Sequence, residues 1–361
     1  MIELLRRHVV SISFLAIFLV FVFLSRDGEG DIQQLSGYTM GTTYELQIVD
    51  MPEGIAPEQI AAEVTALLAE LDTGIFSTYA ADSELSRFNR HAVDVPFTAS
   101  RQLLEVLQLA QSVAVLSNGA FDVTVGPLVN AWGFGPPVDN QDGIQDGIQD
   151  GIQSTVPTQS RIDELLATVG YQNLEIIPAR SEIRKTKPSY VDLSGIAKGY
   201  AVDQVAAYFD GLGVANYFLE IGGELKIKGT KPGGVNWVPA IEAPIDGESR
   251  VYEIFSNRGE TIGVAGSGDY RNFFEADGIR YSHEIDPHTG RPISHNLAAV
   301  YVIAAETALA DALATAFMVL GTDAGAELAE RENLAVYFIY KTADAGFADY
   351  ISSEFSRFLE P

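Results

Sequence analysis

Two short stretches, far apart in the chain, carry the groups that a magnesium ion and a diphosphate would need. In the second stretch, Asp311 and Thr315 are four residues apart in an Ala- and Leu-rich run with helical period. Their side-chain oxygens therefore lie on one helix face, one turn apart. Magnesium takes one or two protein carboxylates together with substrate phosphates and water. The spacing predicts a magnesium site at these two residues.

Both residues also have an ordinary structural interpretation. A helical threonine often donates its hydroxyl to the preceding turn, and an aspartate on a helix is usually solvated. Alanines flank the two oxygens on both sides and leave little bulk beside them. Small neighbours suit the close approach of a ligand, but they equally suit close helix packing.

The first stretch, Asp192-Leu-Ser-Gly-Ile-Ala-Lys-Gly199, follows a strand-like segment and leads into a run with helical spacing. A helix that begins at this glycine-containing turn directs backbone N–H groups and its positive end at an anion. Lys198 adds a mobile point charge. The chain has no Gly-x-Gly-x-x-Gly or Walker-type motif, so the structural alternative is that Asp192 simply caps the turn.

Two glycine-punctuated segments place an acid near an aromatic residue. They are Gly119-Ala-Phe-Asp-Val-Thr-Val-Gly-Pro127 and Gly266-Ser-Gly-Asp-Tyr270. Glycine allows backbone to approach a flat ring closely. Two tight turns without a ligand are the alternative interpretation.

Three of the five histidines, His283, His288 and His295, lie close together in the sequence and raise the question of zinc. Their surroundings are rich in Pro, Gly, Asn and Thr, which is typical of a loop. No helical His-x-x-x-His pair occurs. We therefore do not predict a zinc site here.

The composition limits the classes of function. The 361 residues are 47% apolar, enough for a large core. With 23 basic against 49 acidic residues, the net charge is −26, which excludes sequence-independent binding to nucleic acid or anionic lipid. An anionic ligand would need local positive charge from a metal, Lys198 and backbone amides. The absence of cysteine excludes disulfides, thiolate chemistry and lipid attachment at a cysteine.

The N-terminal 30 residues form a separate unit. Arg6 and Arg7 precede an apolar run from Val9 to Leu24, which is typical of an export signal or a membrane anchor. The following Ser25-Arg-Asp-Gly-Glu offers no small-x-small cleavage site, so we favour an uncleaved anchor. The two arginines keep the N-terminus in the cytoplasm, and residues 31–361 are therefore expected on the exported side.

The rest of the chain has the pattern of one α+β domain. Alternation over residues 38–49 predicts the first strand, and Ser83 is placed to cap a short helix. Further helices and strands do not alternate regularly, which favours α+β over a doubly wound fold. Helices are predicted at 57–71, 100–117, 200–212, 307–319 and 323–331, and strands at 216–220, 224–229, 238–242, 251–255, 261–265, 273–275, 297–303 and 335–340.

Between Pro137 and Pro157 the tetrapeptide Gln-Asp-Gly-Ile repeats three times. It is too polar and glycine-rich to pack, so we predict an exposed, disordered loop insertion near residues 138–157. A calcium-binding Asp-Gly array is the alternative, although a period of four does not match the nonapeptide calcium repeats.

The ordered combination of motifs resembles the ApbE family of FAD:protein FMN transferases, which are periplasmic, magnesium-dependent flavin transferases. The resemblance covers roughly residues 36–340. The motifs that carry it are Tyr38-Thr-Met-Gly-Thr42, Ser77-Thr-Tyr79, Ser83-Glu-Leu-Ser-Arg-Phe-Asn89, Gly119-Ala-Phe-Asp122, Asp192 to Ala201, Ile221-Gly-Gly-Glu224, Ser267-Gly-Asp-Tyr270, His283 to Pro292 and Ala310 to Ala316.

The resemblance implies a single mixed catalytic domain with an N-terminal hydrophobic helix, FAD as substrate and Mg²⁺ as cofactor. It also implies a location on the periplasmic side of the bacterial inner membrane, with residues 9–24 as the anchor. Asp311, Thr315 and a backbone carbonyl near Gly195 would hold magnesium. The residues that would line the FAD site are Met40, Tyr79, Ala120, Phe121, Asp122, Asp192, Lys198 and Ile285.

Three departures from the family pattern stand out. The lipoprotein cysteine that is frequent in the family is absent, the Gln-Asp-Gly-Ile loop is extra, and Glu284 takes the place of a more usual apolar residue between His283 and Ile285. None of the three falls on a predicted ligand.

The hypothesis that follows is transfer of FMN to a protein. A Thr or Ser hydroxyl of an acceptor redox protein, in a short Asp/Ser/Thr/Gly-rich motif, would attack the phosphorus on the FMN side of FAD, and AMP would leave. His283, with a reference pKa near 6.5, is the candidate general base, and Asp286 is the substitute. A loop histidine hydrogen-bonded to backbone is the structural alternative for His283.

Two other functions use the same residues. A metal-dependent FAD pyrophosphatase would let water attack and would release FMN and AMP. A periplasmic flavin-binding protein would store FAD without turnover, and it would not need the Asp311/Thr315 pair. The sequence does not identify the acceptor, the oligomeric state or the number of metal ions.

Overall fold

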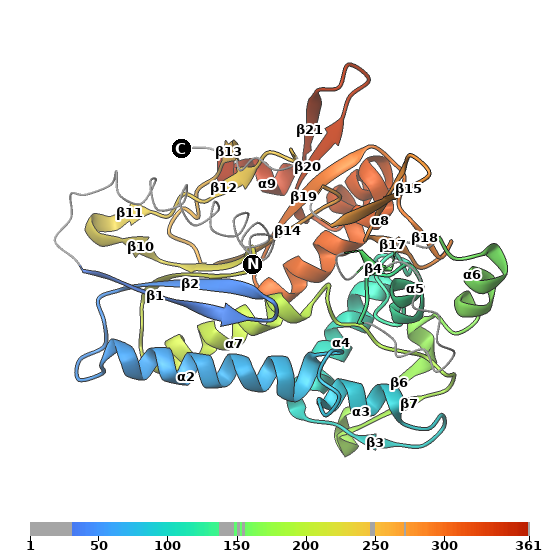
Figure 1. Cartoon of the computed structure of the whole chain (residues 1–361). Coiled ribbons are helices and arrows are strands. Elements are labelled where there is room, and N and C mark those ends of the chain that lie inside the picture. Colours follow the sequence, from blue (N-terminus) through green and yellow to red (C-terminus); the bar gives the residue numbers. More distant parts are fainter. Residues whose placement is uncertain are drawn as a thin grey trace.

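An eight-stranded antiparallel sheet forms the centre of the molecule (Figure 1). The computed structural model describes residues 31–136, 148–149, 152–153, 156–245, 250–270 and 272–359. The strand order is β1-β2-β8-β9-β14-β19-β20-β21. Their bounds are β1 Ile32–Thr39, β2 Thr42–Val49, β8 Asn216–Ile221, β9 Glu224–Lys228, β14 Ile262–Gly268, β19 Leu297–Ala304, β20 Ala335–Lys341 and β21 Phe347–Ile351.

Both faces of this sheet are buried, which explains its apolar strands. Along β19, Val300 and Val302 join the core on one face, whereas Ala299 and Ile303 join the core on the other. A strand covered on both faces carries an almost continuous apolar run. The α+β class predicted from the sequence is confirmed by this sheet and its helices.

Half of the buried residues in the larger core come from four helices, of which α2 and α7 run beneath the β1–β2 hairpin in Figure 1. They are α2 Pro57–Ala69, α4 Arg101–Leu116, α7 Ala197–Gly211 and α8 Thr307–Arg331. By length and composition α8 could cross a membrane, but 61% of its most apolar window is buried in the protein. Gly321, at φ +75°, interrupts α8, so both helices predicted over 307–331 are present within it.

The opposite face of the sheet packs against the C-terminal helix and two short hairpins. Trp237, Phe255, Phe355 and Phe358 fill this second core. The elements are β10 Thr230–Lys231, β11 Val235–Asn236, β12 Ala240–Glu242, β13 Val251–Ile254 and α9 Ser353–Leu359. The candidate site is therefore on the other face of the sheet, which the helices cover.

The remaining elements gather at one end of the molecule in Figure 1. A third apolar cluster there includes Trp132, Phe274 and Ile285, and Trp132 Nε1 donates 2.8 Å to the carbonyl of Gly290. The elements are α3 Glu84–Arg90, β3 Phe97–Thr98, α5 Gly126–Ala131, α6 Gln159–Leu166, β6 Leu174–Ile177, β7 Glu182–Lys185, β15 Phe273–Ala276, β16 Ile279–Ser282, β17 Ile285–Asp286 and β18 Arg291–Pro292. The predicted cap of α3 is confirmed, because Ser83 Oγ accepts a 2.9 Å hydrogen bond from the amide of Ser86.

The predicted first strand, residues 38–49, is wrong in one respect, because a hairpin replaces it. β1 ends at Thr39 and pairs with β2 from Thr42 onward. Met40 and Gly41 form the turn with φ values of +48° and +72°, the left-handed conformations that a two-residue hairpin needs. The apolar pattern runs on through the turn and gave no sign of the reversal.

Two predictions lie wholly or largely outside the described residues. Residues 1–30, with the signal or anchor, are not described. Within the repeat loop only β4 (Ile148–Gln149) and β5 (Ile152–Gln153) are described, and they pair as a two-residue antiparallel ladder.

Candidate active site

Helices α7 and α8 touch where the two chemistry-bearing stretches of the sequence meet. A Cβ on Gly199 would stand 2.5 Å from the carbonyl oxygen of Thr307 and 2.8 Å from Cβ of Asp311. Only glycine permits this approach. The Gly199 amide donates a 2.9 Å hydrogen bond to Oδ2 of Asp311, so the start of α7 holds the carboxylate in a fixed orientation.

A second glycine brings the helix-start turn against the predicted metal ligands. A Cβ on Gly195 would lie 2.8 Å from Oγ1 of Thr315 and 3.3 Å from Cε2 of Phe121. The 2.8 Å distance to Thr315 is shorter than the contacts that real Cβ atoms make, so only glycine fits at this position. Gly195, Thr315 and Phe121, which lie far apart in the sequence and which the family resemblance assigns to the metal and FAD sites, therefore meet at one point.

Asp311 and Thr315 do not follow their ordinary structural interpretations. Asp311 is only 4% exposed, and its Oδ1 accepts no hydrogen bond from any described residue. Thr65 and Thr73 donate their hydroxyls to carbonyls four residues earlier, whereas Thr315 makes no such bond within the described chain. Two hard oxygens thus have no hydrogen-bond partner among the described residues, which leaves them available to a magnesium ion.

The described residues hold no group of three or more His, Asp or Glu side chains arranged for a metal. A cation at Asp311 and Thr315 would therefore take further oxygens from backbone, water and substrate, which is how Mg²⁺ is usually bound.

Electrostatics at Asp311 favour a cation. Burial raises the pKa of Asp311, while Lys198 and the amide of Gly199 lower it without cancelling the effect. A bound cation would favour the ionised carboxylate. The site therefore holds a carboxyl group whose charge is costly until a positive ion compensates it.

Lys198 lies in a buried ion pair beside this carboxylate. Its Nζ is 2.6 Å from Oε1 of Glu224, whose side chain is only 2% exposed. Oε2 of Glu224 has no hydrogen-bond partner among the described residues. Burial raises the pKa of Glu224. Burial alone would lower the pKa of Lys198, but Glu224 and Asp311 raise it on balance, so the lysine keeps its charge.

The helix-start turn differs from the sequence prediction in two ways. Tyr190 forms only an isolated bridge with Val125, and the backbone of Val191 pairs with the side chain of Asn89 at 2.7 and 2.8 Å, so no strand precedes Asp192. In addition, the amide of Ala197 donates a 2.8 Å hydrogen bond to the carbonyl oxygen of Leu193 within the turn. This amide is therefore already used by the protein. Lys198 is therefore the principal group of this turn for holding an anion.

Asp192 caps its turn, as the structural alternative proposed, by accepting 2.8 Å from the amide of Ser194 at Oδ1. Its negative charge also reaches Tyr79 and Tyr190, because in each the pKa is raised first by burial and next by Asp192. Tyr79 is 67% exposed. An exposed ring beside Asp192 is available for stacking on a flat ligand, and Tyr190 is a neighbour that the sequence did not single out.

The carboxylate of Asp122 stabilises the loop that carries it. Its Oδ1 accepts from the amide of Thr124 at 2.8 Å and from the Thr124 hydroxyl at 2.6 Å, and its Oδ2 accepts from the amide of Tyr171 at 2.7 Å. Burial raises the pKa of Asp122. The adjoining Ala120 and Phe121 are 2% and 4% exposed, so this loop presents mainly backbone and one ring edge to the site.

Two further predicted residues occupy turns. Met40 takes the first left-handed position of the β1–β2 hairpin, and its amide donates 3.0 Å to Oδ2 of Asp72. Asp286 accepts from the amide of His288 at 2.8 Å and from the hydroxyl of Thr289 at 2.9 Å. Its carboxylate therefore stabilises the β17–β18 turn. Ile285 is 5% exposed within the third apolar cluster.

The candidate base His283 follows β16 and has a defined ring orientation. Its Nδ1 lies 3.1 Å from the carbonyl oxygen of Asn272. A carbonyl only accepts, so Nδ1 carries the hydrogen and Nε2 is the basic nitrogen of the neutral ring. The side chain is 31% exposed. This backbone bond, foreseen as the structural alternative, is compatible with general-base action because it leaves Nε2 unprotonated.

Glu284, the unusual residue beside His283, turns inward. Its side chain is 9% exposed, and Oε1 lies 3.5 Å from Nε2 of His283. Burial raises the pKa of Glu284, His283 lowers it and Asp311 raises it further. The sequence interpretation placed Glu284 away from the ligands, whereas its charge interacts with the metal-site carboxylate.

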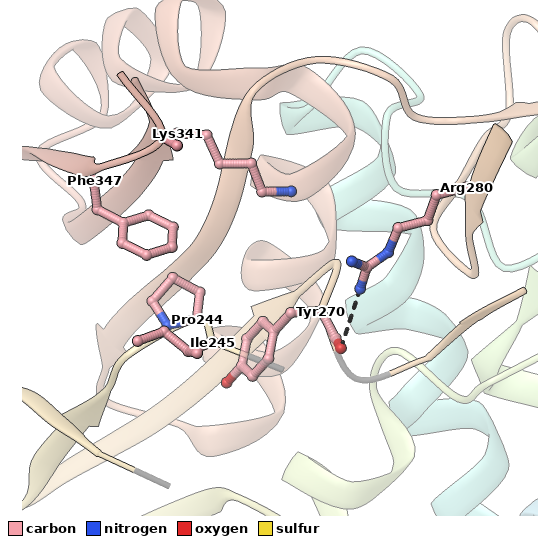
Figure 2. Close-up of a pocket in the computed structure, with 7 residues that line it drawn as sticks. Pro244, Ile245, Tyr270, Arg280, Lys341 and Phe347 are labelled. Carbon is pink, nitrogen blue, oxygen red and sulfur yellow. Dashed lines mark hydrogen bonds between the residues drawn. The ribbon is translucent and has the colours of Figure 1, made fainter. Parts of the chain in front are cut away.

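A pocket of about 390 Å³ adjoins this region on the side of β20 and β21 (Figure 2). Figure 2 shows Arg280 pointing to the carbonyl oxygen of Tyr270, at 3.3 Å. The lining residues are Pro244, Ile245, Tyr270, Arg280, Lys341, Ala345 and Phe347. None of the predicted FAD or metal residues is among these described lining residues, so this pocket is distinct from the candidate site.

Comparison with known proteins identifies one family. A profile of the ApbE family matches residues 40–338. The chain is 45% identical over 327 residues to an FAD:protein FMN transferase of Vibrio cholerae serotype O1, covering 90% of this chain and 92% of the relative. It is also similar to the solved flavin transferase ApbE from Vibrio cholerae, with 42% identity, a TM-score of 0.79 and coverage of 91% and 100%. The apo Pseudomonas stutzeri flavinyl transferase ApbE gives 38% identity, a TM-score of 0.80 and coverage of 93% and 98%.

Proposed function

The chain belongs to the ApbE family, and from this premise we propose that it is an FAD:protein FMN transferase that needs Mg²⁺. It moves FMN from FAD to a Thr or Ser hydroxyl of an acceptor protein, forms a phosphoester and releases AMP. The observation that carries the proposal is the meeting of Lys198, Asp311 and Thr315 beside Gly195. That meeting supports a cation site next to the positive charge of Lys198.

The donor set fits magnesium. Asp311 Oδ1, Thr315 Oγ1 and the backbone carbonyl of Gly195 would hold the ion, and the ion would neutralise charge on the diphosphate when bound. Lys198 adds a second positive charge, held in place by Glu224. Phosphoryl transfer requires positioning and charge neutralisation more than covalent catalysis, and these residues supply both.

The other predicted residues have distinct tasks in this scheme. Tyr79 offers ring surface to the flavin or adenine, and Phe121 offers a ring edge. Asp122 holds the loop that carries Ala120 and Phe121. His283 Nε2 takes the proton of the acceptor hydroxyl as its oxygen bonds to phosphorus, and AMP leaves with the electron pair of the broken P–O bond.

We also propose where the reaction occurs. The apolar run from Val9 to Leu24 anchors the chain to the bacterial inner membrane, with the catalytic domain on the periplasmic side. Acceptors would be redox proteins that expose a Thr or Ser there. The N-terminal sequence supports this location, and the net charge of −26 supports the absence of nucleic acid among the partners.

The test is incubation of the full chain in detergent with FAD, Mg²⁺ and an acceptor polypeptide, followed by measurement of the acceptor's mass. The parallel variant is Asp311→Ala. We expect the acceptor to gain FMN less one water, and we expect Asp311→Ala to reduce the rate at least about 100-fold, because it removes a charged metal ligand.

Other outcomes would identify the rival functions. Release of free FMN and AMP with an unmodified acceptor would replace the transferase by a pyrophosphatase. Tight binding of FAD that stays intact with Mg²⁺ would replace it by a storage protein. A transfer rate that is unchanged by chelation of the metal would contradict the proposed magnesium requirement.

A further inference from the structure

The pair formed by His283 and Glu284 has a geometry that becomes more favourable when Nε2 of His283 takes up a proton. The Asn272 carbonyl requires the hydrogen on Nδ1 of His283, so Nε2 of the neutral ring presents a lone pair. The atom that faces it at 3.5 Å is a carboxyl oxygen, Oε1 of Glu284. Two hydrogen-bond acceptors repel each other at this distance. A proton that arrives at Nε2 removes the repulsion, because it forms an imidazolium beside the Glu284 carboxylate.

The backbone fixes Glu284 in this position. Its amide donates 3.2 Å to Oγ of Ser282, and its carbonyl accepts 2.9 Å from the amide of Ile293. With both backbone groups bonded and the side chain nine-tenths buried, the carboxyl group has little freedom to turn to solvent. His283, in contrast, is 31% exposed, so its ring can meet an incoming hydroxyl group.

We propose that Glu284 is a positioning residue that strengthens His283 as the base of the transfer reaction by stabilising the imidazolium. This rests on the proposed function. The acceptor hydroxyl proton moves to Nε2 as the hydroxyl oxygen bonds to phosphorus, and the P–O bond to AMP breaks with its electron pair going to AMP. The resulting imidazolium carries its new hydrogen next to the Glu284 carboxylate. The proton then leaves from Nε2 to solvent or to the departing phosphate.

Charged groups on three other elements act on this pair. Lys198 of α7 lowers the pKa of Glu284, and Asp311 of α8 and Asp269, just after β14, raise it. An opposite charge at this distance raises the pKa of an imidazole, and its removal lowers that pKa by about one unit.

The experiment measures the pKa of His283 directly. The full chain in detergent, labelled with carbon-13 at histidine Cε1, is titrated by NMR, and the His283 signal is assigned by its loss in His283→Asn. Wild type is compared with Glu284→Gln, which keeps the size and polarity but not the charge. The control is Glu275→Gln, an exposed glutamate on β15 of the neighbouring hairpin, which removes the same charge at a different place.

We expect Glu284→Gln to lower the His283 pKa by about one unit and Glu275→Gln to leave it within a few tenths. The acidic limb of the pH profile of kcat/KM for FMN transfer should move to lower pH by the same amount. In Glu284→Asp, the His283 pKa should lie between those of wild type and Glu284→Gln. A structural role alone would lower the rate without moving the limb.

Three outcomes would overturn the proposal. The first is an unchanged His283 pKa in folded Glu284→Gln. The second is a shifted pKa with an unmoved kinetic limb, which would mean that His283 is not the base. The third is the absence of FMN transfer in wild type at every pH, which would reject the proposed function itself. The NMR titration separates the third outcome from the first, because it needs no turnover.

Discussion

The amide of Gly199 donates a 2.9 Å hydrogen bond to Oδ2 of Asp311. This bond commits one carboxylate oxygen to the protein and leaves Oδ1 for another ligand. Because Lys198 directly precedes Gly199, the same contact places a cationic residue next to the carboxylate. A single backbone bond thus couples the anion-binding turn of α7 to the candidate metal residues of α8.

The close approach at Gly195 provides the first prediction. In Gly195→Ala the new methyl group would stand 2.8 Å from Thr315 Oγ1 and 3.3 Å from Phe121 Cε2, so Thr315 must move. We expect the affinity for Mg²⁺, measured by isothermal titration with FAD present, to fall on the order of tenfold. The fold should survive, because the strain is local.

Gly211→Ala is the matched control for that variant. Gly211 lies at the other end of α7, and a Cβ there meets nothing within 4 Å. We expect its Mg²⁺ affinity to equal that of wild type. If Gly195→Ala binds Mg²⁺ as tightly as this control, the metal does not lie between Gly195 and Thr315.

The sequence predicted the elements of the site better than their connections. Helical spacing predicted that Asp311 and Thr315 share a helix face, and the glycine-containing turn before α7 was also anticipated. Both signals are local. The contact between the two stretches depends on Gly199 and Gly195 against α8, which is a tertiary fact. It could be expected only from the resemblance to a family.

The groups that sequence reasoning missed are those whose partners lie far along the chain. Glu224 was noted only within a motif, yet its carboxylate pairs with Lys198. Asp203 received no attention, although it bonds two backbone amides of α8. Met40 was read as part of one strand because a two-residue turn does not break the apolar pattern. No local pattern distinguishes these residues from ordinary helix or strand positions.

The buried carboxyl of Glu224 predicts a dependence of stability on pH. Burial raises the pKa of Glu224 above its unfolded value, although Lys198 opposes the shift. The folded state therefore binds this proton more tightly. The resulting stabilisation is complete below the unfolded pKa, about 4.3, and is lost as the pH rises through the higher folded pKa.

Glu224→Gln cannot titrate and isolates this effect. In buffer containing a chelator, the free energy of unfolding of wild type relative to Glu224→Gln should fall as the pH rises from about 5, by at most about 1.4 kcal/mol per pH unit. Denaturant unfolding at several pH values measures it. Glu63→Gln, on the exposed face of α2, should give a constant difference. A difference that rises with pH for Glu224→Gln would contradict the assigned sign.

Asp122 provides a test of whether a predicted FAD residue acts directly or through its loop. Its carboxylate accepts three hydrogen bonds, two from Thr124 and one from Tyr171. Asp122→Ala should lower the free energy of unfolding by about 3 kcal/mol, because buried donors lose their partner. Asp122→Asn should lose less, since one oxygen remains. Chemical denaturation measures the stability, and fluorescence quenching of FAD measures binding. Full stability with lost FAD binding in Asp122→Ala would show a direct contact instead.

Asp203 joins α7 to the start of α8 and should control the metal site from a distance. Its two carboxylate oxygens accept from the amides of Thr307 and Ala308 at 3.0 and 2.9 Å, and Oδ1 pairs with Lys226 at 3.0 Å. Asp203→Ala removes a helix cap, which costs about 1–2 kcal/mol, and leaves the ammonium of Lys226, only 10% exposed, without this carboxylate.

We expect urea unfolding of Asp203→Ala to show a total loss of about 3 kcal/mol, since an uncompensated buried charge adds to the lost cap. Asp203→Asn, which keeps one acceptor for the α8 amides, should lose less. Because Asp311 follows the capped turn on the same helix, Mg²⁺ affinity should weaken in the same order, Ala more than Asn. Asp82→Ala, at an exposed position before α3, should change neither quantity. Weaker stability with unchanged Mg²⁺ affinity in Asp203→Ala would mean that Gly199 alone holds Asp311 in place.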